Sequence, residues 1–443
     1  MSSGAAVTAA SETRHLFALT VIVGCVCGVV AVAFQATIHW LETLLIDRAT
    51  HAHGSTWIFW TIVTPAVGGL LAGVALTWLV PNARGSGIPQ VKQALASAAG
   101  QVPFRDAVGK FLIGAVQIGS GASLGREGPL VQISAGTASA LGRITALPPR
   151  SVKRLTPVGV AAGFAASFNA PIAAVAFTLE EIVGTLDKAT LGGAIVAAGL
   201  AVAVGRELLG VQVLLVLQHA QGQIQPASLP SYLALGLVAA LVSVAFTRSL
   251  LRARLFFRTW HTLPHWTHPA VGGFATGVLA VIALYYFNST GITGGGRPAL
   301  SSVVDGRLGF NAIAALLVMK AVATLLSFSS GGAGGIFTPT LLLGALLGST
   351  VGHFDAWMLG SNESHVGAFA LLGMGALFAG VIRAPVTSVL LIIEMTGNYQ
   401  LVPPLLLINT TAFLLARRLC PLPIYDALLA QDSQVVTGGL PTR

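Results

Sequence analysis

Long apolar stretches without charged side chains alternate along this chain with short polar segments. Residue ranges free of Asp, Glu, Lys and Arg include 15–41, 49–83, 208–247, 259–296, 321–354, 364–382 and 395–416. A membrane-spanning helix needs about 20 mostly apolar residues. The pattern therefore predicts an all-α polytopic membrane protein. It allows on the order of 14 to 18 membrane segments, some of them shorter than a full span.

The composition supports this class and argues against nucleic-acid binding. Charged residues make up 9% of the chain and hydrophobic residues 54%, whereas a soluble domain has roughly 25% charged residues. The formal charge of +9 comes from cations that gather at the ends of apolar stretches, namely Arg150, Lys153, Arg154, Arg248, Arg252, Arg254, Arg258, Arg417 and Arg418. This arrangement is typical of cytoplasmic loops under the positive-inside rule. It forms no basic face with interleaved aromatic residues, as a nucleic-acid site would.

The ends of the chain and its cysteines add little chemistry. Residues 1–14 form a polar N-terminal tail, and the apolar run behind it is too long for a signal peptide, so we expect a retained first helix. Beyond Tyr425 the given sequence has only a short tail, so no soluble regulatory domain is expected. The cysteines Cys25, Cys27 and Cys420 have neither disulfide-framework nor metal-ligand spacing, and no metal site is predicted.

The chain contains an internal duplication. Segment 110–129 aligns with 320–339 without a gap, so that Lys110 matches Lys320 and Pro129 matches Pro339. In the same order, 85–89 aligns with 294–298, and 164–180 aligns with 378–394. We therefore assign one repeat half to 15–225 and the other to 226–419. Paired, glycine- and proline-interrupted apolar segments of this kind indicate the binding site of a secondary transporter.

Two carboxylates break the symmetry of the repeat. Glu127 aligns with Phe337, and Glu181 aligns with Met395. An ionisable side chain at membrane depth is costly and is interpreted as functional, so both are candidates for proton chemistry. Glu180, by contrast, aligns with Glu394, so an acid there serves both halves and is interpreted as structural. Lys110 and Lys320 are interpreted in the same way.

The glycine-rich segments predict helix N-termini that face a ligand. Each ends in a proline that opens an apolar run, at Pro89, Pro129 and Pro339, and proline suits the first turn of a helix. The free N–H groups and partial positive charge of such an end attract anions, and in hydrocarbon these donors need a partner. Three such ends would bind an anion without a fully charged cation. Taken singly, each motif could instead serve only close packing or a kink.

In these motifs the chain resembles the CLC family of chloride channels and chloride/proton antiporters. The matching segments are GSGIP at 85–89, GREGP at 125–129, GGIFTP at 334–339 and LPIYDALLA at 422–430. The resemblance implies two inverted-topology halves with broken and tilted helices. It also implies a homodimer with one pathway per subunit. The C-terminal tail, 420–443, carries Tyr425 and is expected to hold no CBS domains.

The resemblance also assigns roles to single residues. Glu127 becomes the gating glutamate, which occupies the anion site when ionised and swings away when protonated, and Glu181 becomes the internal proton glutamate. Ser86 and Tyr425 become the hydroxyl donors of the central site, and Arg126 fixes the loop around Glu127. The complete expected anion-binding set is Ser86, Gly87, Ile88, Arg126, Gly128, Ile336, Phe337 and Tyr425.

Each of these residues also has a purely structural interpretation. Glu127 could be an N-cap carboxylate and Ser86 a turn or capping serine. Tyr425 could belong to the aromatic belt at the membrane surface. Glu181 could cap its helix at the water interface. Gln90, Val91 and Lys92 stand where many bacterial antiporters of the family have acidic residues, which concerns the internal route of the proton.

The expected function is exchange of chloride for protons, with chloride bound as substrate and without a cofactor. The resemblance implies a bacterial cytoplasmic membrane, with both termini on the cytoplasmic side. A passive chloride channel of the same fold, gated by voltage or pH, is the alternative. An intramembrane serine protease that uses Ser86 or Ser120 would belong to a different class and would need a histidine base within hydrogen-bond reach.

Overall fold

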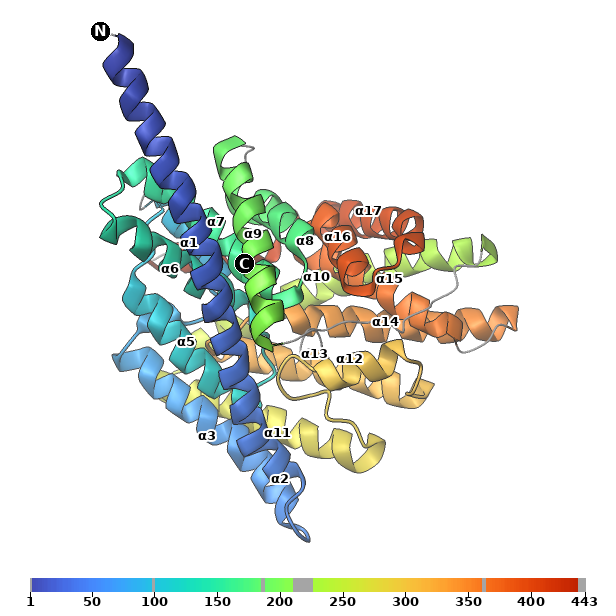
Figure 1. The fold of residues 1–443 in the computed structure, drawn as a ribbon. Coiled ribbons are helices and arrows are strands. Elements are labelled where there is room, and N and C mark those ends of the chain that lie inside the picture. The colour runs from blue at the N-terminus through green and yellow to red at the C-terminus, as the bar shows by residue number, and fades with distance from the viewer. Residues whose placement is uncertain (1, 98–99, 185–187, 210–225, 361–363, 437–443) are drawn as a thin grey trace.

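The computed structural model describes residues 2–97, 100–184, 188–209, 226–360 and 364–436, and it is built from helices (Figure 1). The elements of the first half are α1 (Ser2–Glu42), η1 (Thr43–Asp47), α2 (Arg48–Thr50), α3 (Thr56–Trp78), η2 (Pro81–Ala83), α4 (Ile88–Ser97), α5 (Phe104–Gly119), α6 (Glu127–Ile144), α7 (Pro149–Phe168), α8 (Pro171–Phe177), η3 (Thr178–Val183) and α9 (Lys188–Leu209). Those of the second half are η5 (Pro226–Ser228), α10 (Leu229–Thr259), η6 (His265–Thr267), α11 (His268–Phe287), α12 (Arg297–Val304), α13 (Phe310–Ser329), α14 (Phe337–Leu359), α15 (Ser364–Val381), α16 (Pro385–Thr396), η7 (Tyr399–Leu401) and α17 (Val402–Leu419). Helix α18 (Ile424–Val436) follows in the C-terminal tail.

The lengths of these helices confirm a polytopic membrane protein with some segments shorter than a full span. Among the described residues, eight helical stretches are long and apolar enough to cross a bilayer. The four helices α4, α8, α12 and α16 have 10, 7, 8 and 12 residues and are too short to do so. Short helices of this kind place their ends inside the membrane, where backbone groups need partners within the protein.

Helices α6 and α14 lie at the centre of the protein. The apolar window of α14 is 78% buried, whereas the other long helices are 33% to 44% buried. All but a few residues of α6 are buried as well. These two helices are therefore surrounded by protein rather than by lipid, although α14 by itself is apolar enough for a lipid-facing span.

Helices α3 and α11 cross at a reciprocal contact. A Cβ on Gly69 would collide with the carbonyl oxygen of Pro269, and a Cβ on Gly273 would collide with the carbonyl oxygen of Pro65. Gly73 and Gly277, one turn further along each helix, repeat the arrangement against Trp266 and the backbone of α3. Small residues at four-residue spacing allow membrane helices to approach closely. The matching contacts give the two halves a local two-fold relation.

The paired lysines of the repeat have matching structural partners. Lys110 is fully buried and donates to the carbonyl oxygens of Ala83, at 2.7 Å, and Gly85. Lys320 is fully buried and donates to those of Ile292, at 2.9 Å, and Gly294, at 2.7 Å. Each lysine therefore anchors the glycine-rich loop of its own half, in agreement with the structural interpretation. Neither extends to the membrane surface.

The paired glutamates Glu180 and Glu394 connect the two halves. Glu180 accepts hydrogen bonds from the N–H groups of Val386 and Thr387 at 3.1 and 2.7 Å, at the start of α16. Glu394 accepts them from Ile172 and Ala173 at 3.0 and 2.7 Å, at the start of α8. Each carboxylate caps the helix of the opposite half, where negative charge is favourable. Their structural interpretation agrees with these contacts.

The expected boundaries between the parts of the chain relate to the structure as follows. Helix α1 begins at Ser2, so residues 2–14 of the polar tail continue the first apolar helix. The expected boundary between the halves, at 225/226, adjoins residues 210–225, which lie outside the described residues. The tail from 420 onward contains α18, a further helix that is not part of the repeat. Its Tyr425 is fully buried, which argues against a place in the surface aromatic belt.

The reciprocal helix crossing predicts the effect of a single added methyl group. Gly273→Ala should destabilise the fold by roughly 1 to 3 kcal/mol, because overpacking forces the backbone of α3 away from α11. The measurement is thermal unfolding of the purified protein in detergent. Gly199→Ala in α9 is the matched control, because a Cβ there would have no neighbour within 4 Å. Equal melting temperatures for the two variants would contradict the close crossing.

Candidate functional site

The two glycine-rich loops meet and place two helix N-termini side by side. Gly125 and Gly335 form an isolated antiparallel bridge, in which each N–H donates to the other carbonyl at 2.7 Å. A Cβ on Gly335 would lie only 3.0 Å from the N atom of Gly128. The starts of α6 and α14 are therefore in backbone contact, which residues with side chains would prevent. The N–H groups of Ile336 and Phe337, at the start of α14, have no helical carbonyl partner.

The loop that carries Ser86 brings a third N-terminus to the same place. The N–H of Gly85 donates to the carbonyl of Gly332 at 2.8 Å, which ties this loop to the second half. A Cβ on Gly128 would collide with the Ser86 hydroxyl and lie 2.6 Å from its carbonyl oxygen. Gly87 has a φ of +100°, a conformation that glycine adopts readily. Its N–H donates to Gln90 Oε1 at 3.0 Å rather than towards an anion.

Two buried hydroxyl groups converge at these N-termini. Tyr425, in the first turn of α18, is fully buried, and Ser86 is 1% exposed. The Tyr425 hydroxyl lies near Ser86 and within electrostatic range of Glu127 and Glu181. Neither hydroxyl has a hydrogen-bond partner among the described residues. Because buried polar groups are normally paired, these two donors fit an anion held between them.

Glu127 is the first residue of α6 and is 3% exposed. Its Oε1 lies 3.7 Å from Nε of Arg126, and its Oε2 has no hydrogen-bond partner within the described residues. It contributes to the wall of a cavity of about 540 Å³, together with residues of α1, the Gly295 loop and α14. The carboxylate therefore stands between this cavity and the helix N-termini, as a gating residue requires. A carboxylate with an unpaired oxygen is not held as a fixed cap.

The cavity beside Glu127 is lined by charged groups of both signs. Arg126 and Arg297 supply guanidinium groups, while Glu42 and His39 come from α1. Arg297 was not among the predicted site residues. It aligns with Ile88 in the repeat, so the search for broken symmetry that identified Glu127 would also have identified it. The two arginines make this cavity attractive to anions.

An aromatic cluster surrounds Phe337, the repeat counterpart of Glu127. Its ring centroid lies 4.5 Å from that of Phe378 and 5.1 Å from those of Phe164 and Phe168. Phe177, at 5.9 Å, closes the group. These rings fill the space beside the α14 N-terminus with apolar side chains. The aromatic side of the site excludes water, which strengthens the interaction of an anion with helix dipoles.

Glu181 lies in η3 and is buried next to a lysine. Lys92 Nζ donates to Glu181 Oε1 at 2.7 Å and also forms an ion pair with Asp426. The three residues come from η3, α4 and α18, so this cluster joins the element of Glu181 to the helix that follows the Ser86 loop and to the helix of Tyr425. The expected antiporter pattern has acidic residues in this part of α4, and here a cation takes that place. Its pairing with Glu181 could not be predicted from spacing.

Comparison with known proteins identifies the family. The family model for voltage-gated chloride channels matches residues 68–417. The H⁺/Cl⁻ exchange transporter ClcA of Vibrio campbellii is 32% identical over 418 residues, which cover 93% of this chain and 88% of the relative. The ClcA protein of Yersinia pseudotuberculosis is 30% identical over 93% of this chain and 87% of its own length. This chain belongs to the CLC family.

Solved structures of the CLC family share the fold. A slow cyanobacterial Cl⁻/H⁺ antiporter superposes with a TM-score of 0.85 at 24% identity, covering 94% of this chain and 97% of that one. A CLC-type fluoride/proton antiporter superposes with a TM-score of 0.76, also at 24% identity and with the same coverage. The expected fold class is thereby confirmed. The protein is a multi-pass integral membrane protein of a family of transporters rather than enzymes.

The arrangement also argues against the serine protease alternative. The Ser86 hydroxyl has no hydrogen-bond partner in the described part of the chain, so no described histidine activates it. The Ser120 hydroxyl donates to the carbonyl of Gln117 at 3.0 Å. A nucleophilic serine needs a base within hydrogen-bond reach. Both serines therefore lack the partner that such catalysis requires.

Proposed function

We propose that this protein is a secondary active transporter that exchanges chloride for protons across the membrane. The observation that carries the proposal is the pair of buried, unpaired hydroxyls of Ser86 and Tyr425 beside three helix N-termini, with Glu127 at one of them. Donors of this kind bind a small anion with partial charges, so the anion can also leave. The similarity to ClcA exchange transporters supports protons as the second substrate.

Glu127 gates the anion pathway in this proposal. When ionised, its carboxylate competes with chloride for the N–H donors at the starts of α6 and α14. When protonated, it loses that attraction and turns toward the cavity of about 540 Å³, where Arg126 and Arg297 concentrate anions. One carboxylate thus exchanges places with chloride and carries a proton as it does so. This alternation couples the two ions.

Glu181 supplies the proton from the cytoplasmic side. It is 6% exposed, while its neighbour Lys92 is partly exposed and extends to Asp426 at the surface. A proton can therefore reach Glu181 along the cluster without passing through the anion site. Lys92 donates a hydrogen bond to Oε1 of Glu181. Proton transfer through Glu181 therefore requires either that Lys92 releases Oε1 or that the proton binds to Oε2. A passive chloride channel is the second candidate, because a lasting Lys92–Glu181 pair would block proton transfer.

The test of the exchange function uses proteoliposomes with an imposed chloride gradient and no proton gradient. The wild type should drive protons against their own gradient. Glu127→Gln should retain chloride flux while proton movement falls at least roughly tenfold, because an amide cannot carry the proton. Proton movement is followed with an entrapped pH dye and chloride with an electrode.

The outcomes separate the candidates. Chloride flux without proton movement in the wild type would make the protein a channel. Proton pumping that persists in Glu127→Gln would remove Glu127 from the gate. The absence of both fluxes in a correctly folded preparation would contradict transport altogether.

The role of Glu181 has a control at the adjacent carboxylate. Glu181→Gln should lower proton movement at least roughly tenfold while chloride flux continues, measured in the same proteoliposomes. Glu180→Gln should keep the chloride-to-proton ratio of the wild type, because Glu180 caps α16 and faces no proton route. If proton movement were lost in Glu180→Gln but kept in Glu181→Gln, Glu180 would be the proton carrier and Glu181 the structural residue.

A homodimer in a bacterial cytoplasmic membrane, with both termini cytoplasmic, completes the proposal. The caps of α8 and α16 lie at the protein surface beside Ile172 and Val386, which are 60% and 56% exposed. Charged groups at membrane depth are unfavourable against lipid, and a second copy packed on this face would cover them. Light scattering of the protein in detergent should give the mass of two subunits. The mass of one subunit would contradict the dimer.

A further inference from the structure

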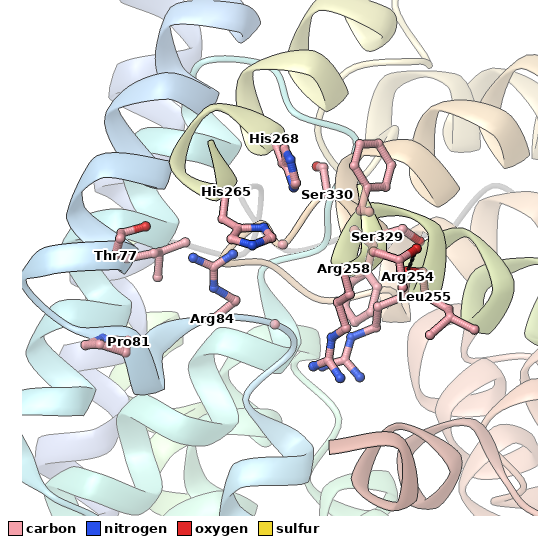
Figure 2. Close-up of a pocket in the computed structure, with 16 residues that line it drawn as sticks. Thr77, Pro81, Arg84, Arg254, Leu255, Arg258, His265, His268, Ser329 and Ser330 are labelled. Carbon is pink, nitrogen blue, oxygen red and sulfur yellow. Dashed lines mark hydrogen bonds between the residues drawn. The ribbon is translucent and has the colours of Figure 1, made fainter. Parts of the chain in front are cut away.

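A second cavity lies apart from the anion site, and arginines from two sides line it. Its volume is about 660 Å³, and Arg84, Arg254 and Arg258 contribute to its wall together with His265 and His268 (Figure 2). Arg84 comes from the loop before Ser86, and the other two arginines come from the last turns of α10. Figure 2 shows Arg84 beside His265 on one side of the space and the two α10 guanidiniums together on the other.

The positive charge of this cavity is only partly neutralised. Asp432 of α18 accepts hydrogen bonds from Arg254, at 2.8 and 3.1 Å, and from Arg258. Arg84 has no hydrogen bond or ion pair through its side chain among the described residues, and it is close enough to Arg258 to be repelled by it. Arg254 and Arg258 thus share one carboxylate, and Arg84 has none within the described part of the chain. An additional anion between them would relieve this repulsion.

The cavity wall holds Arg84 in position rather than leaving it free to turn away. Its guanidinium packs over Gly331, where any Cβ would collide with Nη1. Gly331 has a φ of +95°, which favours glycine. The hydroxyls of Thr77, Ser329 and Ser330 donate to backbone carbonyls. Arg254 and Arg258 already donate to α18, and the His268 ring is paired with the Leu263 carbonyl. Among the described residues, the donors of the cavity that remain without a hydrogen-bond partner are therefore the Arg84 guanidinium and the His265 imidazole.

These donors match phosphate better than they match chloride. Guanidinium forks bind phosphate oxygens in pairs, and a tetrahedral phosphate can meet forks from two opposite sides. The cavity is also many times larger than one chloride ion. Its apolar lining, which includes Leu76, Leu255 and Phe257, leaves room for the body of a larger molecule attached to the phosphate.

The cavity lies at the level of the membrane surface. Trp78 is 61% exposed and packs against Trp266, with 5.9 Å between the ring centroids. Trp260 stacks on His268, with 5.5 Å between the ring centroids. Tryptophans gather at the boundary between lipid and water, and arginine-rich helix ends mark the cytoplasmic side. Basic pockets between helices on this side suit phosphate headgroups of lipids. Free phosphate compounds of the cytoplasm reach the same place.

We propose that this cavity binds the phosphate group of an anionic ligand, separate from the transported anion. The phosphate lies between Arg84 and the pair Arg254 and Arg258, and it competes with Asp432 for the latter two. Both flanking elements belong to the transport pathway, because Arg84 precedes the Ser86 loop and Asp432 shares α18 with Tyr425. The cavity itself does not depend on the proposed exchange function.

The test measures binding directly and separates two sources of phosphate. Purified full-length protein in detergent is titrated with pyrophosphate by calorimetry, and with phosphatidic acid or phosphatidylcholine by native mass spectrometry. Arg84→Gln should weaken the binding of pyrophosphate or phosphatidic acid at least roughly tenfold, the loss of a charge-assisted fork. Arg252→Gln, on the same helix but outside the cavity wall, is the matched control and should bind like the wild type.

A variant that is expected to bind phosphate more tightly tests whether the weaker binding of Arg84→Gln results only from misfolding. Asp432→Asn removes the competing carboxylate and should tighten binding several-fold, whereas a misfolded protein would bind less. Binding of phosphatidic acid alone would identify a lipid headgroup, and binding of pyrophosphate alone a free phosphate compound. Absence of binding by both probes, or equal losses in Arg84→Gln and Arg252→Gln, would overturn the proposal. Because binding is measured without transport, this result is independent of the exchange function.

Discussion

The structure depends on one constraint, which is that backbone N–H groups inside a membrane need partners. Short helices such as α4, α8 and α16 cannot cross a bilayer, so their ends lie at membrane depth, where water is scarce. At α8 and α16 the partners are carboxylates of the opposite half, Glu394 and Glu180. At α6 and α14 no side chain among the described residues caps the first turn in this way. The donors that are satisfied structurally in one place are, in the proposed function, the ones that bind the transported anion in the other.

The two-fold relation between the halves separates scaffold from chemistry. Residues that the repeat keeps have matching structural contacts: Lys110 with Lys320, Gly125 with Gly335, and Glu180 with Glu394. The residues that differ between the two halves include the buried carboxylates Glu127 and Glu181. Glu127 stands opposite Phe337, which an aromatic cluster surrounds, and Glu181 stands opposite the buried Met395. The positions that the repeat keeps thus form a symmetric frame, and the proposed proton carriers are positions at which the two halves differ.

Helix α18 connects three charged or polar centres although it lies outside the repeat. Its first turn places Tyr425 beside Ser86, its Asp426 pairs with Lys92, and its Asp432 pairs with Arg254. A small movement of this helix would alter the surroundings of Ser86, of Glu181 and of the arginine-lined cavity together.

The sequence by itself determined the membrane class, the duplication and the glycine- and proline-marked helix starts, and it singled out Glu127 as the residue that departs from the repeat. These follow from local properties, because hydrophobic length, backbone freedom and aligned repeats can be recognised along the chain. Only the tertiary structure decided that Lys92 joins Glu181 to Asp426 and that Arg84 faces Arg254 and Arg258, whereas the family resemblance had already placed Ser86 and Tyr425 together. Such pairs come from segments far apart in the chain, and their contact depends on how helices pack rather than on any spacing between residues. Arg297 depends on both sources of information. Its alignment with Ile88 shows that it differs between the repeat halves, and the packing of the helices places it in the cavity beside Glu127.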